Sequence, residues 1–193
     1  MECPVPGAQC PVFSRRPLGT GHWALLLAML FVSCSFFSKT KSTVYTIDRV
    51  PGQVTAKTGA PLAINSIELP AGFDRKEIVV RKANNQLDVR GTEQWPATLS
   101  DVVLHTLAYD LADRLPAGMM ILPGATKPAS ARSIDIVFED LSAGPDPKVV
   151  LDARIGTAQQ RIEVPVTSLK SADVATGMSQ ALAQLADRIV SAK

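Results

Sequence analysis

The side chains best suited to catalysis or metal binding are unevenly distributed along this 193-residue sequence. The three cysteines, Cys3, Cys10 and Cys34, all lie in the first 34 residues, and His105 is the only histidine after residue 34. Thiolates and imidazoles are the usual zinc ligands, and cysteines form disulfides and act as nucleophiles. We therefore expect no disulfide, zinc ribbon or thiol nucleophile after residue 34.

His105 is the one remaining candidate for acid–base chemistry. It lies four residues after Asp101 and four before Tyr109, away from the leucine stripe of a segment with helical periodicity. We interpret it as a hydrogen-bonded residue on a solvated helix face; the alternative is the base of a lipoprotein hydrolase. A hydrolase needs an activated nucleophile, but the sequence contains no G-x-S-x-G motif. The sequence also has no phosphate-binding G-x-x-x-x-G-K-[ST] motif. We therefore predict that the protein is not an enzyme and binds no cofactor or metal.

Cys34 follows a segment typical of an export signal. Arg15 and Arg16 precede an uninterrupted apolar run, residues 23–32, which ends in Ser33-Cys34-Ser35. A basic region, a short apolar region and small residues at its end are the components of a secretory signal. The alternative is a membrane span, which needs about 20 apolar residues and would have to include Gly19, Gly21 and His22. In both cases the two arginines stay inside, and the remaining chain is exported.

The segment Phe31-Val32-Ser33-Cys34 resembles the bacterial lipobox, in which the cysteine becomes the lipidated first residue after cleavage. Ser33 and Val32 fit this pattern, whereas Phe31 replaces the usual leucine. We predict a signal peptide at 1–33, a lipidated Cys34 with a polar tether at 34–43, and one domain at 44–193. An unmodified cysteine in an ordinary signal is the alternative. Ser35 in place of aspartate is typical of lipoproteins sorted to the outer membrane.

The composition indicates a folded domain without a nucleic-acid partner. Apolar residues make up 46% of the chain and charged residues 20%, which is enough to form a core. The formal net charge is +2, and the positive residues do not cluster. A nucleic-acid surface would show a concentrated basic patch.

The first half of the domain has the pattern of strands. We expect strands at 44–47, at 62–69 with a bulge, and at 78–82 and 86–90 as a hairpin around Asn84-Asn85. A helix follows at 97–115, with leucine or valine every four residues and Pro96 before its first turn. A short buried strand is expected at 119–122.

The second half combines more strands with another helix. Apolar and polar residues alternate at 133–141 and 149–155, with the turn Gly144-Pro145-Asp146-Pro147 between them, which predicts an antiparallel hairpin. A strand around 162–166 and a helix at 171–191 complete the domain. We predict an α+β fold after the N-terminal lipoprotein signal: a mainly antiparallel sheet with two amphipathic helices packed on one face.

The helices share a short phrase, Leu-Ala-Asp-Arg followed by Leu or Ile, at 111–115 and 185–189. This similarity is consistent either with a duplicated unit or with two unrelated amphipathic helices. We interpret the charges in both phrases, Asp113, Arg114, Asp187 and Arg188, as helix-surface residues.

Two further residues are candidates for a contact with a partner. Arg81 follows the apolar strand residues 78–80 and is either an edge charge that discourages sheet aggregation or part of a docking surface. Trp95 is the only tryptophan of the domain and lies just before the first helix. We interpret Trp95 as a residue that packs at the start of the helix; the alternative is a contact with a partner.

These residues carry a resemblance to a known family. Tyr45-Thr46-Ile47, the segment 74–81 ending in Arg81, and Leu87, Trp95 and Leu99 follow one another in the order seen in the ABC-type transport auxiliary lipoprotein component family. The late hairpin and the last helix extend the resemblance over 44–193. Ile47 replaces a leucine, and Pro96-Ala97-Thr98 differs from the usual residues after the tryptophan. The family includes the paraquat-inducible protein C-like outer-membrane lipoproteins.

The resemblance implies an outer-membrane lipoprotein that faces the periplasm and is held by its lipid anchor. Its implied role is a non-catalytic auxiliary component of an ABC- or MCE-type (mammalian-cell-entry-type) envelope lipid transport system. The implied partners are an inner-membrane permease and an MCE-type substrate-binding protein, with a neighbouring copy of the chain as a further candidate. A structural cell-envelope lipoprotein without a transport role is the alternative.

Overall fold

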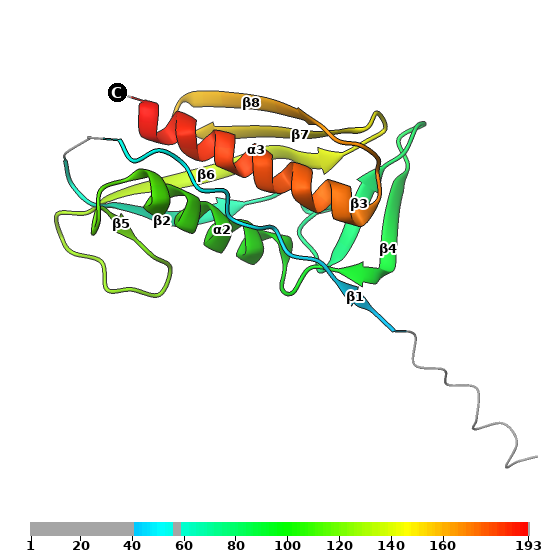
Figure 1. The fold of residues 1–193 in the computed structure, drawn as a ribbon, viewed down its shortest axis with the longest axis horizontal. Coiled ribbons are helices and arrows are strands. Elements are labelled where there is room, and N and C mark those ends of the chain that lie inside the picture. Colours follow the sequence, from blue (N-terminus) through cyan, green and yellow to red (C-terminus); the bar gives the residue numbers. More distant parts are fainter. Residues whose placement is uncertain (1–40, 56–58, 193) are drawn as a thin grey trace, which may run out of the picture. The chain divides into compact units, whose positions relative to one another are not determined.

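The structure is a computed structural model, and it describes residues 41–55 and 59–192 (Figure 1). The predicted signal peptide, Cys34 and most of the tether lie outside the described residues. The strands are β1 (Thr43–Val44), β2 (Leu62–Glu68), β3 (Glu77–Arg81), β4 (Leu87–Gln94), β5 (Met120–Ile121), β6 (Arg132–Ala143), β7 (Lys148–Ile155) and β8 (Ala158–Pro165). The helices are α2 (Leu99–Arg114) and α3 (Ser171–Ser191).

The strands form one mixed sheet, so the prediction of a mainly antiparallel sheet was wrong. The order is β1-β4-β3-β6-β2-β5, and β7 and β8 extend the sheet from β6. The pairs β3–β4, β6–β7 and β7–β8 are antiparallel, whereas β1–β4, β2–β5, β2–β6 and β3–β6 are parallel. Turn motifs in the sequence identify only antiparallel strands that follow one another along the chain, so they give no sign of the parallel pairs. The connection from β2 to β6 passes through α2, and long crossovers of this kind join parallel strands.

The local elements follow the sequence pattern closely. The β3–β4 hairpin turns at Asn84 and Asn85, whose φ angles are 61° and 60°, a region that asparagine tolerates. The predicted bulge of β2 appears as a shift in its register with β6 between Ile64 and Ser66. The β6–β7 hairpin turns where predicted. At this turn Gly144 has a φ of 87°, and a Cβ there would lie 2.3 Å from the carbonyl oxygen of Arg81.

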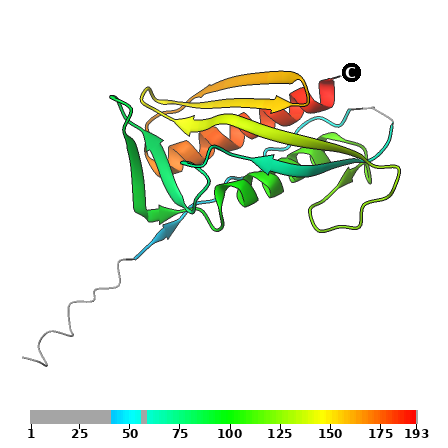
Figure 2. The same ribbon diagram turned by 180° about the vertical axis from the view of Figure 1, so that it is seen from behind.

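Both helices lie on the same face of the sheet, as the sequence predicts. Figures 1 and 2 view the sheet from opposite sides, with α2 and α3 in front of it in one view and behind it in the other. Leu99, Leu107 and Leu111 of α2 are buried together with α3 residues such as Leu182 and Leu185. Strands β6 and β7 contribute inward-facing residues to this core, among them Phe138 and Leu151.

The first predicted strand is shorter than expected. Thr43 and Val44 pair with β4, and after a last backbone hydrogen bond, from the amide of Tyr45 to the carbonyl of Gln94 over 2.8 Å, the chain leaves the sheet. Residues 45–55, which we call the strap, run across the helices as an extended segment (Figure 1). The apolar pattern at 44–47 reflects the burial of Ile47, which is 5% exposed, and not the presence of a longer strand.

Candidate functional site

The strap is fixed to the helices by hydrogen bonds along its length. The hydroxyl of Thr106 on α2 donates to the carbonyl of Ile47 over 3.1 Å. The amide of Asp48 donates to the hydroxyl of Ser179 on α3 over 2.9 Å. The strap therefore binds both helices, and it joins the rest of the domain to the segment that leads from Cys34.

A cluster of three charged residues, Asp110, Arg114 and Asp187, lies where the strap crosses the helices; we call it the helix–strap cluster. Arg114 is 2% exposed, and its Nε donates to Oδ1 of Asp187 over 2.6 Å. Its Nη1 donates to the carbonyl oxygens of Val50 (2.9 Å) and Asp110 (3.0 Å). The guanidinium thus connects α2, α3 and the strap.

Glycine at position 52 allows the strap to lie against this guanidinium. A Cβ at Gly52 would lie 2.5 Å from Cζ of Arg114 and 2.6 Å from its Nε. Such distances are too short for real atoms, so a larger residue would push the strap away from α2.

Asp110 is fully buried, and its two carboxylate oxygens have different surroundings. Oδ1 accepts the amide of Val50 over 2.8 Å, whereas Oδ2 has no hydrogen-bond partner within the described part of the chain. Burial raises the pKa of Asp110 to about 6, against the opposing effects of the Val50 amide and of Arg114.

The interpretation of the charges at 113–114 and 187–188 as surface residues was wrong for Arg114. The side chain of Asp187 is 59% exposed and that of Asp113 is 25% exposed, but that of Arg114 is 3% exposed. Arg114 and Asp187 occupy different positions of the two repeated phrases and pair with each other across the helix interface. In the sequence, the only feature that links Arg114 and Asp187 is that both belong to the repeated Leu-Ala-Asp-Arg motif.

Arg81 is held by its own domain. Its Nε donates to the hydroxyl of Ser142 over 2.8 Å, its Nη2 lies 3.1 Å from Oδ1 of Asp140, and its guanidinium stacks 4.9 Å from the ring centre of Phe73. Because β3 pairs with β4 on one side and Val80 pairs with β6 on the other, the interpretation as an edge charge was wrong. The Arg81 side chain is 39% exposed, so part of its surface faces solvent.

Trp95 and His105 occupy contrasting environments. Trp95 is 2% exposed and belongs to the core, which supports packing at the helix entry. His105 is exposed on α2, and its Nδ1 lies 2.9 Å from the backbone oxygen of Asp101 rather than from the carboxylate. The carboxylate of Asp101 accepts the hydroxyl of Thr98 over 2.6 Å. His105 therefore makes a hydrogen bond within its own helix, whereas Trp95 is part of the core.

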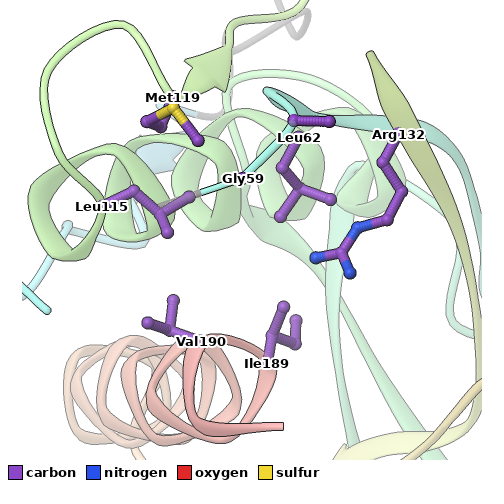
Figure 3. A pocket seen from close by; sticks show the side chains of 8 residues that line it. Gly59, Leu62, Leu115, Met119, Arg132, Ile189 and Val190 are labelled. Atoms are coloured by element: carbon purple, nitrogen blue, oxygen red, sulfur yellow. The ribbon is translucent and has the colours of Figure 1, made fainter. Parts of the chain in front are cut away.

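A cavity of about 120 Å³ lies at the C-terminal end of α3 (Figure 3). Most of its lining is apolar and comes from segments far apart in the sequence. The lining residues are Gly59, Ala60, Leu62, Leu115, Met119, Arg132, Ile189 and Val190. No local pattern in the sequence connects these segments, so the sequence does not predict this cavity.

The described residues contain neither a metal-binding cluster nor a helix that could span a membrane. Over 41–55 and 59–192, no three histidine, cysteine or acidic side chains are grouped closely enough to hold a metal ion. Within the same ranges, neither helix is long and apolar enough to cross a membrane.

Comparison with known proteins establishes the family. The family model for the ABC-type transport auxiliary lipoprotein component matches residues 45–190, and the chain belongs to this family. No curated protein matches the sequence. Family membership supports a transport-associated role at the cell envelope without catalysis, alongside other components of a transport system.

Two solved structures share the fold at low sequence identity. One is the crystal structure of an uncharacterized protein, with 10% identity and a TM-score of 0.61, and the match covers 77% of this chain and 96% of that one. The other is protein XCC0632 from Xanthomonas campestris, a DUF330 protein, with 18% identity and a TM-score of 0.55. That match covers 77% of this chain and 92% of the other.

Proposed function

We propose that this chain is a non-catalytic, lipid-anchored auxiliary component of an ABC- or MCE-type envelope lipid transport system. It would sit on the periplasmic side of the outer membrane, attached through Cys34. The observation that carries the proposal is the family match over 45–190, which spans nearly the whole domain and begins directly after the predicted tether.

The short tether supports a role close to the membrane. Thr43, the first residue of β1, comes nine positions after Cys34. Nine residues span at most about 32 Å, since an extended chain covers up to about 3.6 Å per residue. A domain attached in this way would present its surface to partners near the membrane.

The candidate docking residue of the segment 78–81 is Arg81, because Ile78, Val79 and Val80 are buried. Arg81 would supply the contact itself, because its side chain is partly exposed, while the buried Trp95 would support the adjoining backbone from the core. The occupant would be the MCE-type substrate-binding protein or a neighbouring copy of this chain.

The proposed function can be tested by recovering partners from crosslinked envelopes. Full-length protein is isolated after crosslinking in cells, and the captured proteins are identified by mass spectrometry. We expect a permease and an MCE-type protein. Consistent recovery of cell-wall or structural envelope proteins alone would support a structural lipoprotein instead.

Two variants test the lipid anchor and the docking residue separately. Cys34→Ala should abolish labelling by a radioactive fatty acid and leave the precursor unprocessed; equal labelling of both proteins would contradict the anchor. Arg81→Gln removes the charge without placing a second carboxylate beside Asp140. With matched melting temperatures, reduced partner recovery would support docking at Arg81, and unchanged recovery would exclude this surface.

A further inference from the structure

A second cavity adjoins the one at the C-terminal end of α3. It has a volume of about 280 Å³ and lies between the end of α3 and the strands β6, β7 and β8. Its lining residues are Arg132, Ile134, Ile155, Ala158, Gln160, Arg188, Ile189 and Ala192. Arg132 and Ile189 line both cavities, so the two spaces are neighbours, and we call them together the α3-end trough.

The trough has the size of a small ligand site. Ligand pockets usually measure about 300–1,000 Å³, and the two cavities together reach the lower part of this range. The smaller cavity is comparable with an engineered apolar cavity of about 150 Å³ that binds benzene. Such dimensions suit one narrow apolar chain rather than a pair of chains.

The lining combines apolar side chains with positive charge. Leucine, isoleucine, valine, methionine and alanine residues form most of the lining, which also contains two arginines, Arg132 and Arg188, but no aspartate or glutamate. An apolar site with a few placed polar groups is the usual arrangement for binding an amphiphilic molecule.

Arg132 is the residue that points to a ligand. Its side chain extends from β6 toward α3, beside Leu62 and Ile189 (Figure 3). Within the described residues, its guanidinium makes no hydrogen bond or ion pair, although its backbone amide donates to Pro61. A guanidinium has five N–H donors and favours a carboxylate or phosphate in a bidentate geometry.

Arg188 lines the second cavity together with Arg132 and keeps spare donors. Its Nη1 donates to the carbonyl of Arg161 over 2.9 Å and approaches Oε1 of Gln160 at 3.3 Å. The carbonyl dipoles at the end of α3 are a competing reason for two arginines here, because cations stabilise helix C-termini. That role requires no apolar trough beside the charges.

We propose that the α3-end trough binds a single-chain lipid with an anionic head, of which a long-chain fatty acid is the simplest. The acyl chain occupies the apolar lining, and the head group pairs with Arg132. This inference is independent of the family match. A transport auxiliary that holds no lipid of its own would contradict it without contradicting the proposed function.

The proposal is tested with the full-length protein in phosphatidylcholine vesicles. The probe is a palmitate analogue with a photoactivatable diazirine in its chain, and labelled peptides are located by mass spectrometry after irradiation. We expect labelling of the peptides that contain Met119 and Ile189. Unlabelled palmitate or lysophosphatidic acid should compete, and whichever competes better identifies the head group as carboxylate or phosphate.

Two variants test separately whether binding needs the positive charge of Arg132 and whether it needs the open volume of the trough. Arg132→Glu should reduce labelling about tenfold, the loss expected from one strong charged hydrogen-bonded pair. Ile189→Trp should reduce it similarly by filling the trough from a half-buried helix position. Arg75→Glu is the matched control, since Arg75 is a partly exposed arginine outside both linings, paired with Glu77 at 3.6 Å. Melting temperatures are compared for all variants.

Several results would overturn the proposal. Labelling spread evenly over the surface, unchanged labelling in folded Arg132→Glu protein, or equal competition by hexadecanol would show that no anion site exists. Stronger labelling of the same peptides by a diazirine phosphatidylcholine would show that the occupant has two chains. Partner recovery from crosslinked envelopes is measured on the same variants, so failure of the lipid site and failure of the transport role remain distinguishable.

Discussion

Two clusters of charged residues in this domain each place an arginine beside acidic residues but lie in opposite environments. The helix–strap cluster joins α2, α3 and the strap around Arg114, whose side chain is 3% exposed. The outer-face cluster lies on the side of β7 and β8 that faces away from the helices; it consists of Lys148, Asp152, Arg161 and Glu163. The difference is the solvent around each guanidinium.

Solvent access decides what each cluster can contribute. The side chain of Arg161 is 60% exposed, and it lies 2.9 Å from Oε1 of Glu163. Exposed pairs of this kind gain little, because water screens the charges and the side chains lose conformational freedom. A buried charge that loses a partner is costly, because no water replaces the interaction. The helix–strap cluster should therefore dominate stability, and the outer-face cluster should affect mainly solubility.

The largest effect is expected for Arg114→Met. The variant keeps much of the side-chain volume but removes the positive charge that favours the buried Asp110 carboxylate, and it leaves the backbone carbonyls of Val50 and Asp110 without their donor. We expect a loss of about 3 kcal/mol in the free energy of unfolding, at the lower end for breaking a buried pair because Asp187 is itself exposed. Urea denaturation measures the loss. An effect no larger than that of Arg161→Met would contradict the comparison.

Asp110 makes the helix–strap cluster dependent on pH. Its folded pKa of about 6 lies above the unfolded value of about 4, so the folded state binds the proton more tightly. Its contribution to stability is complete below about pH 4 and is lost as pH rises through 6. The change amounts to about 2–3 kcal/mol.

Comparison with Asp110→Asn isolates this contribution. The free energy of unfolding is measured by urea denaturation at intervals between pH 4 and 7. We expect the difference between wild type and variant to change by the amount above across this range, since asparagine does not titrate. A constant difference would show that Asp110 keeps an ordinary pKa.

A smaller effect is expected for Ser179→Ala, which removes one attachment of the strap. The hydroxyl of Ser179 accepts the amide of Asp48 and donates to the carbonyl of Ala175. Its loss should cost about 1 kcal/mol, the usual net value of a hydrogen bond. Hydrogen exchange at Asp48 should become faster. Unchanged exchange in the variant would show that the strap is held by its other contacts alone.

The sequence predicted the elements whose pattern is local. The helix at 171–191, the bulge in β2 and the hairpins at 83–85 and 144–147 all depend on residues within one turn or a few positions of each other. The parallel pairing of β2 with β6 depends on segments about 70 residues apart. No periodicity within either strand records that neighbour, so the sheet type was missed.

The sites were harder to predict than the fold, for two physical reasons. Asp110 and Arg114 follow Val103 by seven and eleven positions, which places them on the buried side of α2 at helical spacing. The residue type of Arg114 suggested a surface, and only the contacts with the strap and with Asp187 explain its burial. The α3-end trough combines residues from the loop before β2, from β6 and from α3, so it exists only in the folded chain.

The smallest effect is expected for Glu163→Gln in the outer-face cluster. Hydrogen bonds from Lys148 and Arg161 lower the pKa of Glu163, so this carboxylate contributes stability above its unfolded pKa and loses it as pH falls through the folded value. Because water and salt screen the cluster, the melting temperature of the variant should match that of wild type at neutral pH and moderate salt. Repeating the melt at low salt provides the sensitive measurement, since a small destabilisation should emerge there as screening weakens. A large loss of stability at both salt concentrations would mean that exposure does not separate the two clusters, and the contrast between Arg114 and Arg161 would then need another cause.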